Sequence, residues 1–231
     1  MDKIYYNKYL KYKQKYLDLK KITDDINYLM DLKIIHPHCV HDNGNIKDAK
    51  SYSEKGYAIT YGEMEYEALK KFYEMFNNYK FFIDFGSGYG RTVLYMGYFM
   101  DKSIGIELVT ERHEKAELSK NKLSVKYPDI ASKVKLINDD MFNYLSDITK
   151  ETFSSPVLIW ISNLCFGEEI TKRLFDELIK KMPSDSIIGS SKIPNYIPDG
   201  IEPVYIDGKN NKLTVPMSWN KNSEIFIYKI K

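Results

Sequence analysis

Residues 81–90 read FFIDFGSGYG, an apolar run broken by Asp84 that leads into the glycines Gly86, Gly88 and Gly90. The apolar run predicts a buried strand. The glycines let the backbone turn tightly into a following helix and approach a bound molecule closely. Because open α/β sheets bind ligands at the carboxyl ends of their strands, this turn predicts a cofactor site.

Segments on either side of this turn alternate between short apolar runs and longer stretches with helical periodicity. The predicted strands lie at 81–85, 103–107, 133–138, 156–162 and 186–190, and the predicted helices at 91–100, 110–126 and 168–181. Segments 202–206 and 224–230 predict a terminal antiparallel pair. The alternation predicts an α/β fold with a doubly wound, mostly parallel sheet.

Composition places the chain among globular proteins. Its 231 residues are 43% hydrophobic and include only 12 Gly and 8 Pro, which excludes a disordered or fibrous chain and favours one core with a short appendage. Two cysteines, Cys39 and Cys165, indicate reduced intracellular thiols rather than a disulfide framework. Apolar runs such as 157–161 are too short to span a membrane, and no signal peptide is recognisable, so we expect a soluble protein that is not secreted.

The formal net charge of +2 is unevenly divided. Residues 1–23 carry seven Lys and two Asp, a net charge of +5, which leaves −3 for the rest of the chain. Apolar side chains there recur at spacings of four and three, which predicts an amphipathic basic helix. The helix either packs its apolar stripe on the body or acts as an arm that binds nucleic acid or a partner. The stripe consists of Tyr5, Tyr9, Tyr12, Tyr16 and Leu19, and the lysines are Lys3, Lys8, Lys11, Lys13, Lys15, Lys20 and Lys21.

We therefore predict three regions: a basic arm at 1–35, a loop at 36–60 and a catalytic domain at 61–231. The loop contains His36, His38, Cys39 and His41, four residue types that can bind a metal. Their spacing is too dense for one tetrahedral site, and no second cluster accompanies them. We expect a loop near the substrate entrance and no metal.

Acidic residues end the first three predicted strands. Asp84 would repel a pyrophosphate but suits the ammonium of an amino-acid group, which points to S-adenosylmethionine. Glu107 can accept both ribose hydroxyls. The third strand ends in Asp139-Asp140-Met141-Phe142, where one of the two acids can bind the adenine amino group while Met141 or Phe142 packs on the ring. A plain turn between strand and helix is the alternative for the glycine motif alone.

The fourth predicted strand ends with Asn163, and the aromatic residue Phe166 follows three positions later. This spacing is typical of methyltransferases that modify amines. An amide oxygen can orient the amine hydrogens, and an aromatic face stabilises the cation that develops during transfer. No strong base is needed if the site favours the uncharged amine. The alternative is a strand end with a polar cap.

Five motifs in order resemble the Dot one-type (disruptor of telomeric silencing, non-SET) histone lysine methyltransferases. The resemblance covers roughly residues 60–231. The motifs are Tyr61-Gly62-Glu63, the turn 84–90, 162–167 (Ser-Asn-Leu-Cys-Phe-Gly), Ser190-Ser191-Lys192 and Ser218-Trp219.

This resemblance implies a seven-stranded class I fold that uses S-adenosylmethionine to methylate a histone lysine of the nucleosome. It implies that Tyr61, Asn163, Phe166 and Trp219 form the catalytic site. It implies cofactor binding by Tyr61, Glu63, Asp84, Gly86, Ser87, Gly88, Gly90, Glu107, Asp140, Met141 and Asn163.

Two departures stand out: the family usually has Gln where this chain has Arg91, and Thr where it has Met64. The family also uses a lysine-rich segment to bind nucleosomes, and the basic head is the strongest candidate here. The Tyr- and Lys-rich composition is similar to that of giant DNA viruses that infect amoebae. We expect a monomer that acts in the nucleus or in a viral replication compartment or virion, with no membrane contact.

Two other functions fit the same residues. The first is an amino-group methyltransferase for adenine in nucleic acid or for a small amine. The second is a catalytically weak chromatin-binding module that keeps the fold. The acids at the strand ends argue against the second, because a binding module gains nothing from a cofactor site.

Overall fold

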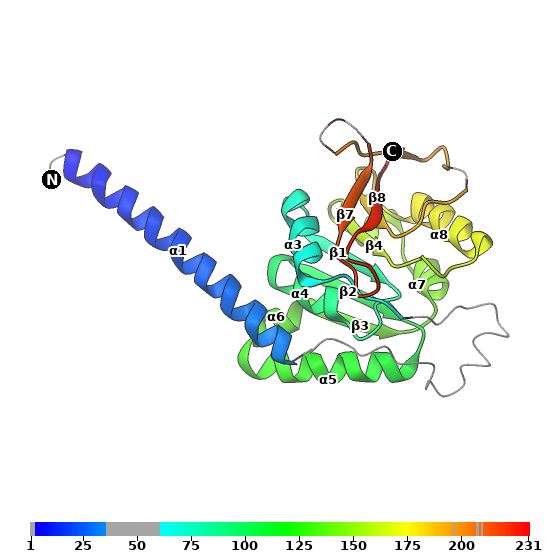
Figure 1. Ribbon diagram of the computed structural model, residues 1–231, viewed down its shortest axis with the longest axis horizontal. Coiled ribbons are helices and arrows are strands. Elements are labelled where there is room, and N and C mark those ends of the chain that lie inside the picture. The colour runs from blue at the N-terminus through cyan, green and yellow to red at the C-terminus, as the bar shows by residue number, and fades with distance from the viewer. Residues whose placement is uncertain (1–2, 36–60, 196, 207, 209) are drawn as a thin grey trace. The chain divides into compact units, whose positions relative to one another are not determined.

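The computed structural model describes residues 3–35 and 61–231, apart from residues 196, 207 and 209. The chain divides into two compact units, Met1–His38 and Cys39–Lys231. The described part of the first unit is one helix of 33 residues, α1 (Lys3–Ile35; Figure 1). This confirms the helix predicted for the head. The predicted loop at 36–60, with its histidines and Cys39, lies outside the described residues.

The second unit is an α/β domain. Its helices are α3 (Tyr66–Met75), α4 (Arg91–Phe99), α5 (Thr110–Lys126), α6 (Pro128–Lys133), α7 (Met141–Asp147) and α8 (Glu168–Lys181), with a short 3-10 turn, η1 (Lys150–Thr152). Its strands are β1 (Phe81–Phe85), β2 (Lys102–Glu107), β3 (Val134–Asn138), β4 (Val157–Ile161), β5 (Ile187–Ser190), β6 (Ile201–Pro203), β7 (Lys212–Val215) and β8 (Ser223–Ile230).

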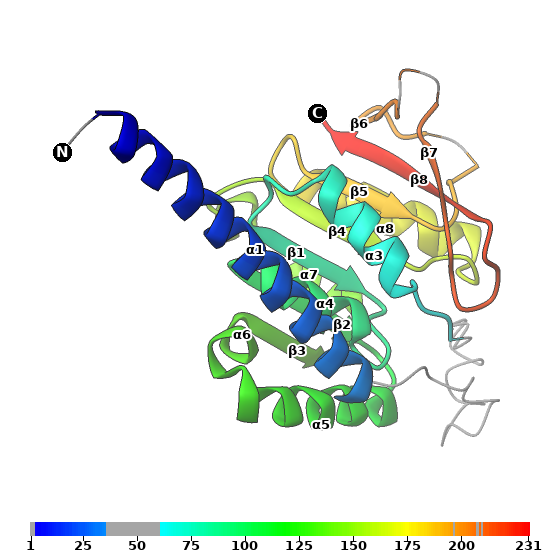
Figure 2. The same ribbon diagram turned by 60° about the vertical axis from the view of Figure 1, so that its left-hand side comes forward.

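These strands form one sheet in the order β3-β2-β1-β4-β5-β8-β6, with β7 also paired to β8. Figure 2 shows this order from β3 at the lower edge to β6 at the upper edge. Strands β1 to β5 pair in parallel, and β8 is antiparallel to its neighbours. The strand order reverses beside β1, between β2 and β4. A switch point of this kind is where ligands of open sheets bind.

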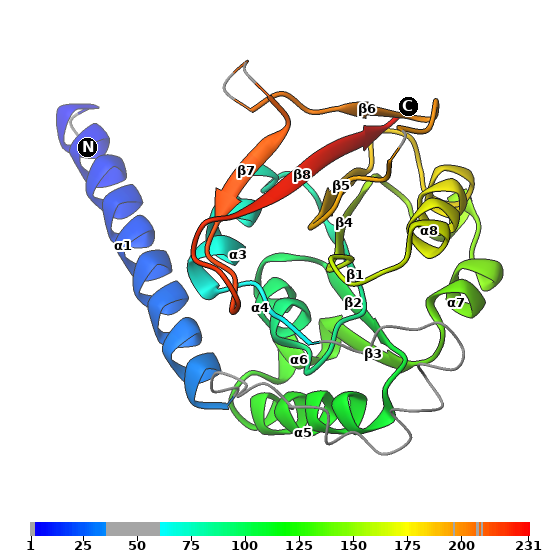
Figure 3. The same ribbon diagram turned by 45° about the vertical axis from the view of Figure 1, so that its right-hand side comes forward.

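The sheet is buried between two layers of helices. In Figures 1 and 3, α3 and α4 lie on one side of it and α7 and α8 on the other. Every residue of β4 is buried, as parallel strands covered on both faces require. Trp160, within β4, packs edge-on against Phe72 of α3, with ring centroids 6.1 Å apart. No helix in the described part of the chain has the length and apolar character to cross a membrane.

The doubly wound fold is confirmed. Helices α5 and α8 begin and end at the predicted residues. Within the described residues the sheet has eight strands rather than seven, because β6 and β7 pair with different parts of the same edge of β8. The sequence analysis missed β7, α3, α6 and α7. Helix α7 had a readable signal, since the Asp140 side chain caps its first turn by accepting a hydrogen bond from the backbone N–H of Phe142.

Candidate active site

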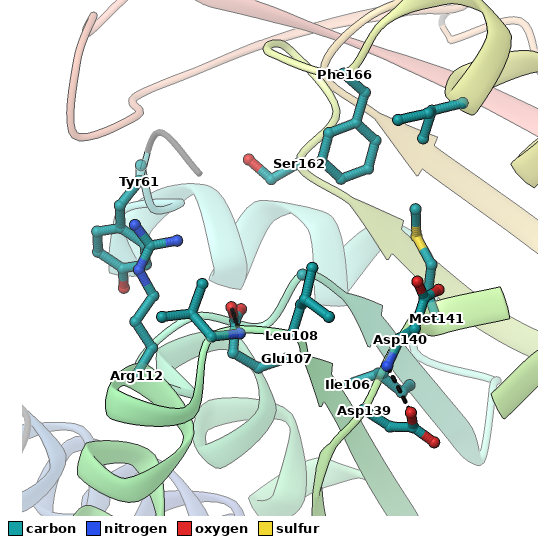
Figure 4. Close-up of a pocket in the computed structure, with 14 residues that line it drawn as sticks. Tyr61, Ile106, Glu107, Leu108, Arg112, Asp139, Asp140, Met141, Ser162 and Phe166 are labelled. Carbon is teal, nitrogen blue, oxygen red and sulfur yellow. Dashed lines mark hydrogen bonds between the residues drawn. The ribbon is translucent and has the colours of Figure 1, made fainter. Parts of the chain in front are cut away.

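A pocket lies at the carboxyl ends of β1, β2 and β4 (Figure 4). Its walls come from the segment before α3, the glycine turn after β1, the end of β2, the first turn of α5, the β3–α7 connection and the loop after β4. The lining residues are Tyr61, Gly62, Gly86, Ile106, Glu107, Leu108, Val109, Arg112, Asp139, Asp140, Met141, Ser162, Phe166 and Ile170. The pocket therefore lies at the switch point of the sheet and includes the glycine turn where the sequence predicted a cofactor site.

Asp84 lies buried in β1, directly before the glycine turn. Its Oδ1 atom has no hydrogen-bond partner among the described residues. Burial, together with the negative charge of Glu107, raises the pKa of the Asp84 carboxyl well above its ordinary value, although a hydrogen bond with the Thr92 hydroxyl acts in the other direction. A cationic group bound at the turn would relieve this cost, so the site fits a ligand with an ammonium.

Glu107 ends β2 and lines the pocket. Its Oε2 accepts a hydrogen bond of 2.7 Å from the backbone N–H of Gly88, and its Oε1 accepts one of 2.8 Å from that of Val109. The two N–H groups fix the carboxylate plane. A carboxylate oxygen can accept more than one hydrogen bond, so a carboxylate fixed in this way suits a ligand with two neighbouring hydroxyls.

Two aspartates and a methionine form the wall after β3. Asp139 Oδ1 accepts hydrogen bonds of 2.7 Å from the backbone N–H of Asp140 and 2.9 Å from the side-chain amide of Asn143. Asp140 and Met141 line the same wall, where the sequence analysis had placed the adenine contacts. Asp139, the first acid of the same pair, is not the one that the family resemblance selected, and the structure places it in the lining as well.

Tyr61 and Arg112 close the pocket on the side of α5. The Arg112 guanidinium carbon lies 5.0 Å from the centroid of the Tyr61 ring. Figure 4 shows the two side chains next to each other. The Tyr61 ring also meets Tyr89 edge-on at 4.7 Å. A Cβ atom on Gly88, whose φ is +55°, would collide with the Tyr61 ring. Arg112 was missed because nothing in the sequence distinguishes it from the other charged residues of α5.

Glu63 does not line the pocket but lies buried behind Tyr61. Its Oε2 is 2.5 Å from Nη2 of Arg91, the first residue of α4, and its Oε1 accepts a hydrogen bond from the Tyr61 hydroxyl. The Arg91 guanidinium carbon also lies 5.2 Å from the centroid of the Tyr66 ring. Arg91, at the position that departs from the family pattern, thus joins the segment before α3 to the glycine turn.

Trp219 packs on the same segment from outside the pocket lining. A Cβ atom on Gly62 would collide with the Trp219 ring, so only glycine permits this approach. The backbone N–H of Glu63 donates to Ser218 Oγ at 2.9 Å, and the backbone N–H of Ser218 donates to the Glu63 carbonyl at 2.8 Å. Two motifs 155 residues apart therefore lie side by side.

The loop after β4 supplies the remaining wall. Ser162 and Phe166 line the pocket, whereas Asn163 is fully buried beside it. Asn163 Oδ1 accepts hydrogen bonds from Ser190 Oγ at 2.8 Å and from the backbone N–H of Lys192 at 2.9 Å. Asn163 Nδ2 donates to the Lys192 carbonyl at 3.1 Å.

The structure thus separates the predicted site residues into two groups. Those that line the pocket are Tyr61, Gly86, Glu107, Asp140, Met141 and Phe166. Those that lie beside or beneath it are Glu63, Asp84, Ser87, Gly88, Gly90, Asn163 and Trp219. Their individual roles toward a ligand stay predictions. The polar lining residues outside the predicted set are Arg112, Asp139 and Ser162.

Comparison with known proteins agrees with this geometry. The family model described as "Histone methylation protein DOT1" matches residues 38–215. No curated protein sequence is similar enough to count as a match. Among solved structures, an O-methyltransferase from Bacillus cereus in complex with SAH is 9% identical, with a TM-score of 0.51, and the match covers 79% of this chain and 87% of that one.

A second solved structure, a SAM-dependent methyltransferase from Neisseria gonorrhoeae, is 11% identical with a TM-score of 0.51, over 71% of this chain and 66% of that one. At these identities the similarity shows the fold alone. It confirms the class I methyltransferase fold.

Proposed function

The chain belongs to the DOT1 histone methylation family, and from this premise we propose that it methylates a lysine of a core histone in the nucleosome, with S-adenosylmethionine as the methyl donor. The observation that carries the proposal is the set of acids at the ends of three adjacent strands, Asp84, Glu107 and Asp140, arranged around one pocket that also holds an aromatic wall.

Each acid suits one part of the cofactor. Asp84, with its buried unpartnered oxygen, would hold the ammonium of the methionine end. Glu107 would accept the two ribose hydroxyls, and Asp140 with Met141 would bind the adenine. When bound, the cofactor supplies a methyl carbon on a sulfonium; the amine lone pair forms the new bond to that carbon while the carbon–sulfur electron pair returns to sulfur.

The residues on the substrate side favour a neutral amine. The acids assigned to the cofactor lie at the ends of β1, β2 and β3. The wall after β4 is formed by Ser162 and Phe166, neither of which is charged. An uncharged wall lowers the cost of losing the proton of a lysine ammonium, which is what makes its nitrogen a nucleophile. The Phe166 ring face would then stabilise the cationic product.

For DNA contact we propose the helix α1. The described part of the chain exposes Lys11, Lys13, Lys15, Lys20 and Lys21 on this helix. If about five phosphates are neutralised, the logarithm of the binding constant should fall with the logarithm of salt concentration at a slope near −4.5. Changing these five lysines to glutamine in the full chain should remove most of that slope. An unchanged slope would exclude α1 as the segment that contacts DNA.

With a nucleosome as its substrate, the protein would act in the nucleus, or in a viral compartment that contains chromatin.

Labelled methyl transfer tests the proposed reaction. The full chain is incubated with methyl-labelled cofactor and, in parallel, with nucleosomes, free histones and naked DNA. The proposal predicts label on histone, with nucleosomes the best acceptor. Label on DNA alone would favour the nucleic-acid amino-group methyltransferase. Cofactor binding without transfer to any acceptor would favour the chromatin-binding module.

A further inference from the structure

Ser162 and Asn163 are neighbours in sequence but stand in different environments after β4. Ser162 lines the pocket, and its hydroxyl makes no hydrogen bond within the described part of the chain. Asn163 has no exposed surface and lies outside the pocket lining. The two residues therefore cannot serve the same purpose.

The side chain of Asn163 is occupied by structural bonds. Its oxygen accepts from the backbone N–H of Lys192 and lies 2.8 Å from Ser190 Oγ, whose single hydroxyl hydrogen is shared between this oxygen and the Lys192 carbonyl at 2.6 Å. Its nitrogen donates to the Lys192 carbonyl. These bonds join the end of β4 to the end of β5. Because Asn163 is fully buried, an incoming amine could reach this oxygen only by opening these contacts.

The same joint extends to α8. Lys192 Nζ lies 2.6 Å from Glu168 Oε1, at the first residue of that helix. Asn163 also holds the turn that follows, because its carbonyl accepts a hydrogen bond of 3.0 Å from the backbone N–H of Phe166. Asn163 thus fixes the loop that carries both Ser162 and Phe166.

Ser162 has the chemistry that the amine requires. Figure 4 shows Ser162 and Phe166 on one wall of the pocket, across from Leu108 and Glu107. A hydroxyl can accept two hydrogen bonds and donate one. By accepting one N–H of a neutral amine, it would fix the direction of the nitrogen lone pair.

We propose that Ser162 is a catalytic residue that orients the substrate amine through its hydroxyl, and that Asn163 is a positioning residue that holds the Ser162 loop. This inference rests on the proposed function. Ser162 forms no covalent bond and neither gains nor loses a proton. The proton that the methylated amine releases passes to solvent.

Four variants of the full chain test the assignment: Ser162→Ala, Ser162→Thr, Asn163→Ala and Ser190→Ala. Four quantities are measured for each: kcat and KM on the acceptor that the wild-type protein methylates, the dissociation constant of S-adenosylhomocysteine, and the thermal unfolding midpoint. Ser190→Ala is the matched control, because it removes a bond of the joint without changing the pocket lining.

Ser162→Ala should lower kcat about 10- to 100-fold, as expected for the loss of one hydrogen bond to the reacting group. KM and the dissociation constant of S-adenosylhomocysteine should stay within about twofold of their wild-type values. The unfolding midpoint should stay within about one degree of wild type. Ser162→Thr, which keeps the hydroxyl, should recover most of the lost kcat. Asn163→Ala and Ser190→Ala should both lower the unfolding midpoint, Asn163→Ala by about 5 °C.

Wild-type kcat in Ser162→Ala would overturn the inference, as would a fall in its unfolding midpoint equal to that of Asn163→Ala. A wild-type protein that methylates an amine other than a histone lysine would contradict the proposed function. The role of Ser162 would then be tested by comparing kcat of wild type and Ser162→Ala with that other amine as the substrate.

Discussion

The carboxyl ends of the strands differ between the two halves of the sheet. In the half formed by β1, β2 and β3, each strand end carries a carboxylate, and Glu107 and Asp140 are held by backbone N–H groups of nearby turns. In the half formed by β4 and β5, the strand ends carry the neutral residues Ser162, Asn163 and Ser190, and the last two are bonded to each other across the strands. The first half suits a charged cofactor. The second suits an amine that must lose its charge before it reacts, since a carboxylate beside it would keep it protonated.

The buried ion pair between Arg91 and Glu63 lies behind the glycine turn of the cofactor half, and breaking it should have the largest effect. Arg91→Gln leaves the Glu63 carboxylate buried without its cation, which should cost about 3–5 kcal/mol of the free energy of unfolding. Chemical denaturation measures the loss.

The matched control is Lys172→Gln, which breaks an exposed pair in α8 with an N–O distance of 2.8 Å and should cost at most about 0.5 kcal/mol. The double variant Arg91→Met with Glu63→Leu should recover much of the lost stability, because neither charge is then left buried. Equal costs for Arg91→Gln and Lys172→Gln would show that the buried pair stabilises the fold no more than an exposed pair does.

Substitution of Glu107 tests whether the cofactor half acts on binding alone. Glu107→Ala removes the proposed acceptor for two ribose hydroxyls and should weaken S-adenosylhomocysteine binding about 100-fold, as measured by isothermal titration. At saturating cofactor, kcat should fall much less, the reverse of the pattern expected for Ser162→Ala. Glu114→Ala, on the exposed face of α5, is the control and should bind as wild type does. Equal losses of affinity and of kcat would remove the distinction between the halves.

The raised pKa of Asp84 predicts a smaller, pH-dependent effect. Only the ionised carboxylate attracts an ammonium, so affinity for S-adenosylhomocysteine should rise with pH up to the raised pKa, by at most about tenfold per pH unit, with release of a proton on binding. The folding stability of the protein without ligand should depend on pH in the opposite direction. Its folded state binds the proton more tightly than the unfolded state, so stability should fall as pH rises from the ordinary carboxyl pKa to the raised one.

Titrations in buffers of different ionisation enthalpy measure this proton release. Asp84→Asn should bind more weakly and lose the proton release. Persistence of the same release in that variant would assign it to another group.

The difference between the halves also decided what could be predicted from sequence. Asp84, Glu107 and Asp140 each follow a recognisable apolar run, so local pattern placed them at one edge of the sheet. The substrate half depends on a contact between distant segments, that of Asn163 with Ser190, 27 residues away. The Gly62–Glu63 segment meets Ser218–Trp219 in the same long-range way. Spacing alone therefore pointed to Asn163 and could not show that its bonds to Ser190 and Lys192 leave Ser162 facing the pocket.

Arg91 is a second case in which a contact between distant segments could not be predicted from the sequence. The sequence marks it as a departure from the family pattern, but only the structure pairs it with Glu63, 28 positions earlier and behind the pocket wall. A single charged residue gives no sign of its partner when that partner lies on a separate segment.

Mass spectrometry of histones tests the central claim most directly. Reconstituted nucleosomes are incubated with S-adenosylmethionine and the full chain, and the core histones and the DNA are then fragmented to locate any added methyl group. The account predicts methylation of a lysine side-chain nitrogen on a core histone, greatly reduced with Glu107→Ala at limiting cofactor. Unmodified histones beside methylated adenine in the DNA would contradict it.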